Sequence, residues 1–210
     1  MKVTDKTTLK IALPLNLAIV FMEIIAAVMS WHDYAWGMFQ FYTQDSNLLA
    51  LAACAVLAVY QIRALRNGSE IPLWAMQFKY FAVCCLSVTF LVVIFVLMPM
   101  MGGMWLMEGT MLYHHLLCPL AAFFGFVFAE KGADIKTKSV RIAMIPTVIY
   151  ALTLIVLNLL HIVEGPYPFL EVYEQSVLMS IVWFILIIGG AWLIAMGVFK
   201  LYRRKGKDKI

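Results

Sequence analysis

Charged side chains are scarce in this sequence. Lys, Arg, Asp and Glu make up 13% of the 210 residues, whereas 64% of the residues are hydrophobic and the mean hydropathy is +0.90. A soluble globular domain keeps about a quarter of its residues charged, because its surface faces water. The scarcity of charge therefore excludes an ordinary soluble domain and indicates a chain whose surface faces lipid.

Cysteine is also scarce, and its placement excludes two further classes of protein. The four cysteines lie inside apolar runs, and none has metal-ligand spacing to a histidine: Cys54, Cys84, Cys85 and Cys118. A disulfide framework needs exposed, paired cysteines, so these four are expected to be small packing residues. Low-complexity segments and internal repeats are lacking too. The apolar runs leave no room for a second domain, so we expect one domain over residues 1–210.

Six apolar windows are long enough to cross a bilayer, which needs about 20 residues of helix. They cover roughly residues 9–30, 44–64, 79–100, 109–129, 141–162 and 176–199. The first window follows three lysines, as in a signal peptide, but its apolar stretch is too long and no small-x-small cleavage site is clear. We therefore predict a retained first helix and an all-α membrane protein with six transmembrane helices.

Basic residues are absent from every second connection. All 16 Lys and Arg precede the first window, follow the last, or lie between windows two and three or four and five. The opposite side carries acidic charges: Asp33, Asp45, Glu108, Glu164, Glu171 and Glu174. By the positive-inside rule the basic side is cytoplasmic, so both termini are predicted to be cytoplasmic. Short basic connections suit anionic lipid headgroups, and no nucleic-acid partner is expected despite the net charge of +4.

Polar side chains inside the spans are informative, because each is costly in lipid unless it is paired or functional. In the predicted outer half such residues occur on four helices, whereas the inner half shows little beyond Ser87 and Thr89. This asymmetry predicts a polar pocket that opens toward the outer leaflet. The outer residues are Glu23, Thr43 and Asn47, His114 and His115, and Asn158 and His161, and Asn16 lies seven residues before Glu23 on the same face of the first helix.

Each of these residues also has an ordinary structural interpretation. Thr43 is a candidate N-cap of the second helix, with its hydroxyl accepting a backbone N–H. Adjacent histidines point about 100° apart on a helix, so only one of His114 and His115 faces the pocket centre squarely. They would make a poor metal pair, and neither a metal nor a cofactor is expected. Glu23 is a candidate partner for a histidine or a candidate proton carrier.

Three segments carry more distinctive patterns. The segment FYTQDSNLLA at 41–50 opens the second helix, LYHHLLCPLAAFFGFVFAE at 112–130 combines histidines with a proline, and HIVEGPYPFLE at 161–171 contains Tyr-Pro-Phe-Leu before an acid. Together with the span count and the length, they resemble the androgen-induced membrane proteins. That family includes the androgen-dependent TFPI-regulating protein and bacterial relatives. The segment YPFLE is the most distinctive of these matches.

The resemblance implies an intramembrane threonine hydrolase that cleaves lipid esters, such as fatty-acid esters of hydroxy fatty acids. It implies Thr43 as the nucleophile and one histidine as its base. Counted back from Pro119, the bacterial-like pattern favours His115 and the animal-like spacing favours His114. The chemistry is reasonable, since a threonine hydroxyl needs a base within hydrogen-bond reach and imidazole suits that task near neutral pH.

Other polar residues are expected to support this pair. Asn47 and Asn158 are the candidate donors to the developing oxyanion. Glu23 or Glu171 is a candidate to orient the histidine. The prolines on either side of Tyr167 are expected to stiffen the loop over the pocket mouth.

Two other functions stay open. A small proton-coupled transporter would use Glu23 and the histidines as a proton path. Against it, the polar residues do not continue into the predicted cytoplasmic half, and no broken helix pair is evident. A non-catalytic lipid-binding protein would keep the pocket without the chemistry. In each case we expect an integral membrane protein of a bacterial plasma membrane, with its site toward the outer leaflet.

Overall fold

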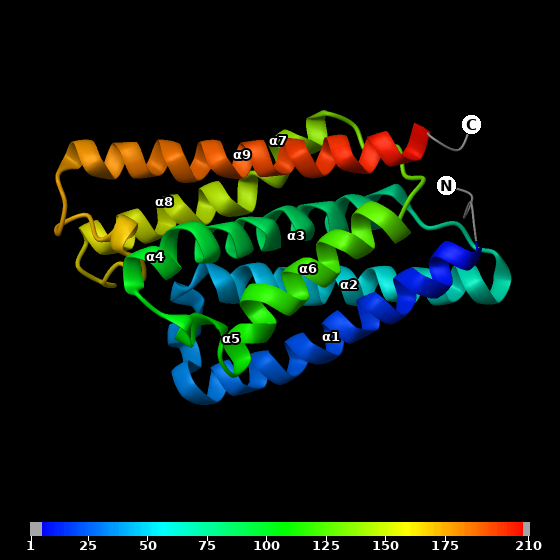
Figure 1. Cartoon of the computed structure of the whole chain (residues 1–210), viewed down its shortest axis with the longest axis horizontal. Helices are drawn as coiled ribbons and strands as arrows, with labels where there is room; N and C mark the ends of the chain where they lie inside the picture. The colour runs from blue at the N-terminus through cyan, green and yellow to red at the C-terminus, as the bar shows by residue number, and fades with distance from the viewer. Residues whose placement is uncertain (1–5, 208–210) are drawn as a thin grey trace.

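The structure is a computed structural model that describes residues 6–207, and these residues form helices and connections without a strand (Figure 1). Within them, six helical segments are long and apolar enough to cross a membrane: Lys6–Gln40, Tyr42–Asn67, Leu73–Met101, Thr110–Ala129, Lys138–Leu159 and Val177–Arg204. Each overlaps one of the windows expected from hydropathy. The predicted all-α fold with six transmembrane helices is therefore confirmed.

Most spans contain more than one helical element. The first is α1 (Lys6–Tyr34) continued by the 3-10 helix η1 (Ala35–Gln40), and the second is α2 (Tyr42–Asn67). The third joins α3 (Leu73–Val92), the π-helix η2 (Val93–Leu97) and α4 (Met98–Met101), and η3 (Met104–Met107) follows it. The fourth joins α5 (Thr110–Leu112), η4 (Tyr113–Leu117), α6 (Cys118–Phe124) and η5 (Gly125–Ala129). The fifth is α7 (Lys138–Ala143) with α8 (Ile145–Leu159), and η6 (Pro168–Leu170) precedes α9 (Val177–Lys207).

A proline explains the π-helical turn in the fourth span. Pro119 has no N–H and cannot form the α-helical bond to the residue four positions earlier. The preceding residue, Cys118, bonds five positions back, to the carbonyl of Tyr113. The widened turn η4 carries His114 and His115, both buried. Single π-turns of this kind are frequent at functional sites.

The first turn of α1 and the last turn of α9 lie at the same end of the bundle, together with the α2–α3 connection (Figure 1). We call this the terminal end, and the opposite end, which carries residues 160–176, the loop end. Lys2 and Lys209 lie outside the described residues. The shared end agrees with the clustering of basic connections, while the assignment of that end to the cytoplasm stays a prediction from charge.

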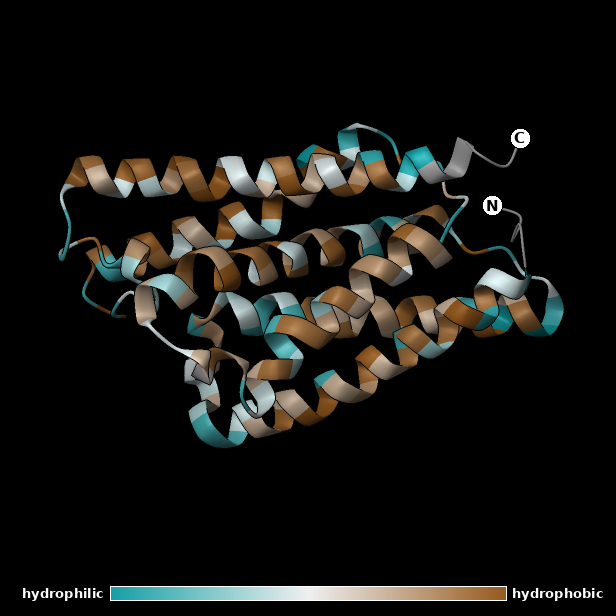
Figure 2. Ribbon diagram, in the orientation of Figure 1, coloured by the Kyte–Doolittle hydropathy of each residue, from teal (hydrophilic) through white to brown (hydrophobic). Residues whose placement is uncertain are grey.

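Hydrophobic residues make up most of the spans (Figure 2), and many of the large ones are exposed on the outside of the bundle. Inside, one apolar cluster around Tyr80 and Phe126 packs α1, α2, α3, α6 and the last turns of α9. A second cluster, with Leu97, Phe169 and Leu154, joins α3, α8 and the 160–176 loop at the loop end. The two clusters fix the positions of the helices that carry the polar side chains.

The helix α9 is packed along only part of its length. Before Ala191 it has no buried side chain among the described residues, and its buried positions then recur at helical spacing: Ala191, Ala195, Val198, Phe199 and Tyr202. The hydroxyl of Tyr80 donates to the carbonyl of Ala195 at 2.8 Å and joins α9 to α3. The half of α9 near the loop end is therefore attached loosely.

Candidate functional site

Thr43 and His115 lie opposite each other near the loop end. Thr43 is the second residue of α2, His115 lies in η4, and 3.4 Å separates Thr43 Oγ1 from His115 Nε2. Both side chains are buried. The N-cap position of α2 is held by Phe41 without a side-chain capping bond, so the interpretation of Thr43 as an N-cap is wrong. The Thr43 hydroxyl is directed at the imidazole.

A backbone carbonyl sets the tautomer of His115. Its Nδ1 lies 2.6 Å from the carbonyl oxygen of Leu106 in η3. Because a carbonyl only accepts, Nδ1 carries the hydrogen and Nε2 presents its lone pair to Thr43. This is the form that a general base requires. The orienting group is thus the Leu106 carbonyl, in place of the Glu23 or Glu171 carboxylate that the sequence suggested.

His114 faces a different neighbour. Its Nε2 lies 3.9 Å from Glu23 Oε2 of α1, and both side chains are 1% exposed. Among the described residues, neither ring nitrogen of His114 has a hydrogen-bond partner, nor does Glu23 Oε1. The structure therefore separates the two histidines that the sequence left as alternatives: His115 contacts Thr43, and His114 accompanies Glu23.

Both candidate asparagines are used by the backbone. Asn47 Nδ2 donates to the Thr43 carbonyl at 2.8 Å and to a carbonyl of η4 at 3.2 Å, which ties the first turn of α2 to the histidine segment. Asn158 Nδ2 donates to Val163 O and its Oδ1 accepts from Val172 N, both at 3.1 Å. These amides position α2 and the loop. They do not point a free donor at Thr43, in contrast to the sequence-based expectation.

The 160–176 loop brings Tyr167 to Thr43. The Tyr167 ring is buried and stacks on Phe169 with 5.2 Å between centroids. Burial raises the pKa of Tyr167, and interactions with the Thr43 hydroxyl and with the backbone at Thr43 and Tyr42 oppose that rise. The first N–H groups of a helix lack intrahelical acceptors. The Tyr167 hydroxyl lies beside those of Tyr42 and Thr43 and beside the Thr43 hydroxyl.

Two other predicted residues stay outside this cluster. His161 comes after the end of α8, has a φ of 57°, and stacks its exposed ring on Tyr173 at 4.4 Å. His161 was expected inside the fifth helix with Asn158, but it lies outside because α8 ends at Leu159 and the chain turns away. Glu171 lies on the loop with its side chain partly exposed.

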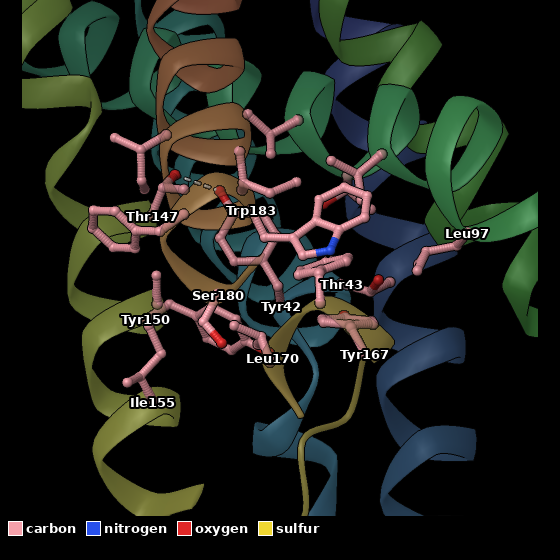
Figure 3. A pocket seen from close by; sticks show the side chains of 18 of the residues that line it. Tyr42, Thr43, Leu97, Thr147, Tyr150, Ile155, Tyr167, Leu170, Ser180 and Trp183 are labelled. Atoms are coloured by element: carbon pink, nitrogen blue, oxygen red, sulfur yellow. Dashed lines mark hydrogen bonds between the residues drawn. The ribbon is translucent and has the colours of Figure 1, made fainter. Parts of the chain in front are cut away.

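Thr43 lies where two apolar cavities meet. One lies between α3, α8, α9 and the loop, and we call it the α9 cavity (Figure 3). The other is lined by His115, Leu106 and residues of α1 and α4, and we call it the histidine cavity. Their empty space, about 780 and 680 Å³, includes the volume at their open mouths. Thr43, Leu97 and Tyr167 line both. Neither lining contains Asp, Glu, Lys or Arg, so the space suits apolar chains.

A second group of buried polar residues was missed in the sequence. Lys79, assigned above to a connection, lies inside α3 and is 1% exposed. Its Nζ contacts Asn16 Oδ1 at 2.6 Å, and Asn16 also bonds Gln61 and Glu130. The expectation that the half near the terminal end contains few polar side chains is therefore wrong. Lys79 and Glu130 each flank an apolar window, which made them resemble connection residues.

No protein-family model, no curated protein and no solved structure matches this chain. The resemblance described above therefore stays a hypothesis. What the site can do is argued from its own geometry.

Proposed function

We propose that this chain is an intramembrane hydrolase of lipid esters, with Thr43 as the nucleophile and His115 as the base. The observation that carries the proposal is the contact between Thr43 Oγ1 and the unprotonated Nε2 of His115 at the junction of two apolar cavities. A hydroxyl beside a correctly oriented imidazole is the arrangement that activates a weak nucleophile. The apolar surroundings suit an ester between hydrocarbon chains.

The proposed reaction has two steps. Thr43 Oγ1 attacks the ester carbonyl while His115 Nε2 takes the hydroxyl proton, and the leaving alcohol receives that proton as acyl-threonine forms. Water, deprotonated by the same imidazole, then releases the acid and restores the hydroxyl. The 3.4 Å contact is long for a hydrogen bond, and contacts of this kind shorten when substrate binds.

Groups around the start of α2 are the proposed hydrogen-bond donors to the oxyanion that forms on the ester carbonyl oxygen. The Tyr167 hydroxyl interacts with the Thr43 side chain, and the N–H groups of Tyr42 and Thr43 lie in the uncapped first turn. Such donors stabilise the negative charge that develops on the carbonyl oxygen. Asn47 contributes by holding that turn against η4.

The two cavities suggest the shape of the substrate. An ester whose carbonyl lies at Thr43 would place its acyl chain in one cavity and its alcohol chain in the other. A fatty-acid ester of a hydroxy fatty acid has that branched form, in agreement with the family resemblance. The site lies at the loop end, which the charge distribution favours as the outer-leaflet side. The resemblance to bacterial relatives favours a bacterial plasma membrane.

The proposal is tested with a fluorophosphonate probe on membranes that contain the protein. Labelling is expected for the wild type and lost in Thr43→Ala and His115→Ala. Thr153→Ala is the control for the threonine, because the exposed Thr153 of α8 lines neither cavity. His161→Ala is the control for the histidine, and both controls should keep labelling.

Unchanged labelling of Thr43→Ala would refute the dyad. If the purified wild type binds lipid esters but does not hydrolyse them, and the probe does not label Thr43, the protein is a lipid-binding protein without this chemistry. Hydrolysis of a branched lipid ester by the wild type, with its loss in Thr43→Ala, would establish the substrate class.

A further inference from the structure

A line of buried polar side chains runs through the bundle along α1. Asn16, Glu23 and Ser30 recur every seven residues on the buried face of this helix. At ~1.5 Å per residue they cover about 21 Å, most of the ~30 Å hydrocarbon core. Residues from α2, α3 and the fourth span complete what we call the polar seam: Gln44, Cys54, Gln61, Lys79, His114, Cys118 and Glu130.

At the loop end, the seam begins beside the candidate site. Ser30 Oγ accepts a hydrogen bond from Gln44 Nε2 at 2.8 Å. About two turns deeper, Glu23 Oε2 lies 3.9 Å from His114 Nε2, and His114 is the chain neighbour of His115. Glu23 Oε1 and both ring nitrogens of His114 lack hydrogen-bond partners among the described residues. Buried groups in this state are costly unless they exchange a proton or bind water.

In the middle of the seam, two thiols connect Glu23 to a lysine. The Cys118 side chain hydrogen-bonds the Glu23 carboxyl and lies within electrostatic reach of Cys54 and Lys79. Cys54 Sγ is 2.8 Å from Lys79 Nζ. Lys79 is thus the ionisable group that follows Glu23 toward the terminal end.

At the terminal end, Lys79 is connected to a second carboxyl. Lys79 Nζ donates to Asn16 Oδ1 at 2.6 Å, and Asn16 Nδ2 donates to Glu130 Oε1 at 2.5 Å and to Gln61 Oε1 at 3.1 Å. Glu130 directly follows η5 and is 4% exposed. Burial raises the pKa of the Glu130 carboxyl, and Lys79, Asn16 and Gln61 oppose that rise. Its Oε2 has no partner among the described residues.

Helix adhesion alone would not require these residue types. Amides and hydroxyls, as in the Ser30–Gln44 pair, join helices in a membrane without burying a titratable group. A carboxyl, a lysine and a histidine inside the spans, with a second buried carboxyl directly after the fourth span, are expensive. Such groups usually mark ion pathways or proton relays. The partnerless atoms of Glu23 and His114 lie about two helical turns below the Ser30–Gln44 pair, and that of Glu130 lies at the terminal end. Such atoms are free to exchange protons in a relay.

We propose that the polar seam is a proton-transfer path between His114, near the loop end, and Glu130, at the terminal end. A protonated His114 gives its proton to the Glu23 carboxylate, which leaves neutral imidazole and a carboxylic acid. Glu23 passes the proton past the two thiols to the Lys79 amine. Asn16 separates Lys79 from Glu130, so the Lys79 ammonium leaves Asn16 Oδ1, contacts the Glu130 carboxylate directly and protonates it. Glu130 then releases the proton at the terminal end. Each step moves one proton and returns the donor to its starting form, so no further reactant is needed.

The path does not depend on ester hydrolysis. It ends at the residue next to His115, so the hydrolase and the path would share a neighbour, yet Thr43 takes no part in it. Failure of either proposal therefore leaves the other testable.

The test is proton flux into vesicles that contain the purified protein and the trapped dye pyranine. A potassium gradient with valinomycin sets the membrane potential, and the dye reports the internal pH. The wild type is expected to move protons faster than protein-free vesicles. Glu23→Gln and Glu130→Gln keep the side-chain shape but cannot carry a proton, so their flux should fall to the protein-free level. Glu108→Gln, which neutralises an exposed carboxylate at the loop end, should keep the wild-type rate.

Wild-type flux equal to that of protein-free vesicles overturns the proposal. So does unchanged flux in Glu23→Gln and Glu130→Gln, because a seam used only for adhesion tolerates both changes. If a variant fails to insert, infrared spectra of the wild type follow the carboxyl bands while a pH gradient is imposed across the vesicle. If no buried carboxyl changes its protonation state in those spectra, the path is contradicted, and no variant is needed for this result.

Discussion

Gly165→Ala is the substitution whose effect can be worked out most directly from the structure. A Cβ at this position would lie 2.7 Å from the backbone N of Glu171 and 2.7 Å from the carbonyl carbon of Leu170. These are backbone atoms, which cannot rotate away as a side chain does. To restore ordinary contact, the segments around Gly165 and around Leu170–Glu171 must separate by about 0.7 Å.

The displacement would reach the candidate site, because the same loop carries Tyr167. Overpacking of this kind costs ~1–3 kcal/mol of stability. A misplacement approaching 1 Å at a catalytic group lowers the rate by up to ~100-fold. We therefore expect Gly165→Ala to unfold at a lower temperature than the wild type and to react with fluorophosphonate about 10- to 100-fold more slowly.

Gly189→Ala is the matched control. A Cβ at Gly189, in α9, meets no heavy atom within 4 Å, and alanine in place of a helical glycine stabilises by up to ~1 kcal/mol. Thermal unfolding in detergent and the rate of probe labelling would be measured for both variants. If Gly165→Ala behaves like Gly189→Ala in both assays, the assumed close packing of the loop is incorrect.

Three further substitutions separate chemistry from packing. Tyr167→Phe should slow probe labelling and turnover by ~100- to 1,000-fold if its hydroxyl is an oxyanion donor, and an unchanged rate would reassign it to packing. Asn47→Leu should lower the free energy of unfolding by ~1–3 kcal/mol, since two buried carbonyls lose their donor, and should weaken labelling at Thr43; equal thermal stability to the wild type would contradict this. Phe126→Ala should cost ~3–5 kcal/mol in detergent unfolding, whereas the same change at the half-exposed Phe124 should cost clearly less.

The spans could be predicted from the sequence because lipid imposes a length and a composition on every crossing helix. The proximity of Thr43 and His115 could not, because the sequence does not state how α2 and η4 rotate against each other. The pairing of Thr43 with a histidine was suggested only by the family resemblance. The tautomer of His115 depends on the Leu106 carbonyl, a backbone group with no sequence signature.

The buried pair of Lys79 and Glu130 shows a second limit. Each flanks an apolar window, so the charge count assigned Lys79 to a connection and Glu130 did not stand out as a residue of a span. The seven-residue spacing of Asn16 and Glu23 was visible and did indicate one polar face of α1. The residues that contact this polar face became clear only in the structure. It places Lys79 inside α3 and Glu130 directly after η5, and both contact Asn16.

The loose attachment of α9 makes the surrounding bilayer part of the cavity. Side chains from the first turns of this helix, such as Trp183 and Ile187, line the α9 cavity, yet this half of the helix buries no side chain of its own. Acyl chains of the membrane therefore support the outer side of the wall. Thickness and fluidity of the bilayer should set how far that wall yields, so the same protein would accept chains of different length in thin and thick membranes, and detergent would remove the restraint.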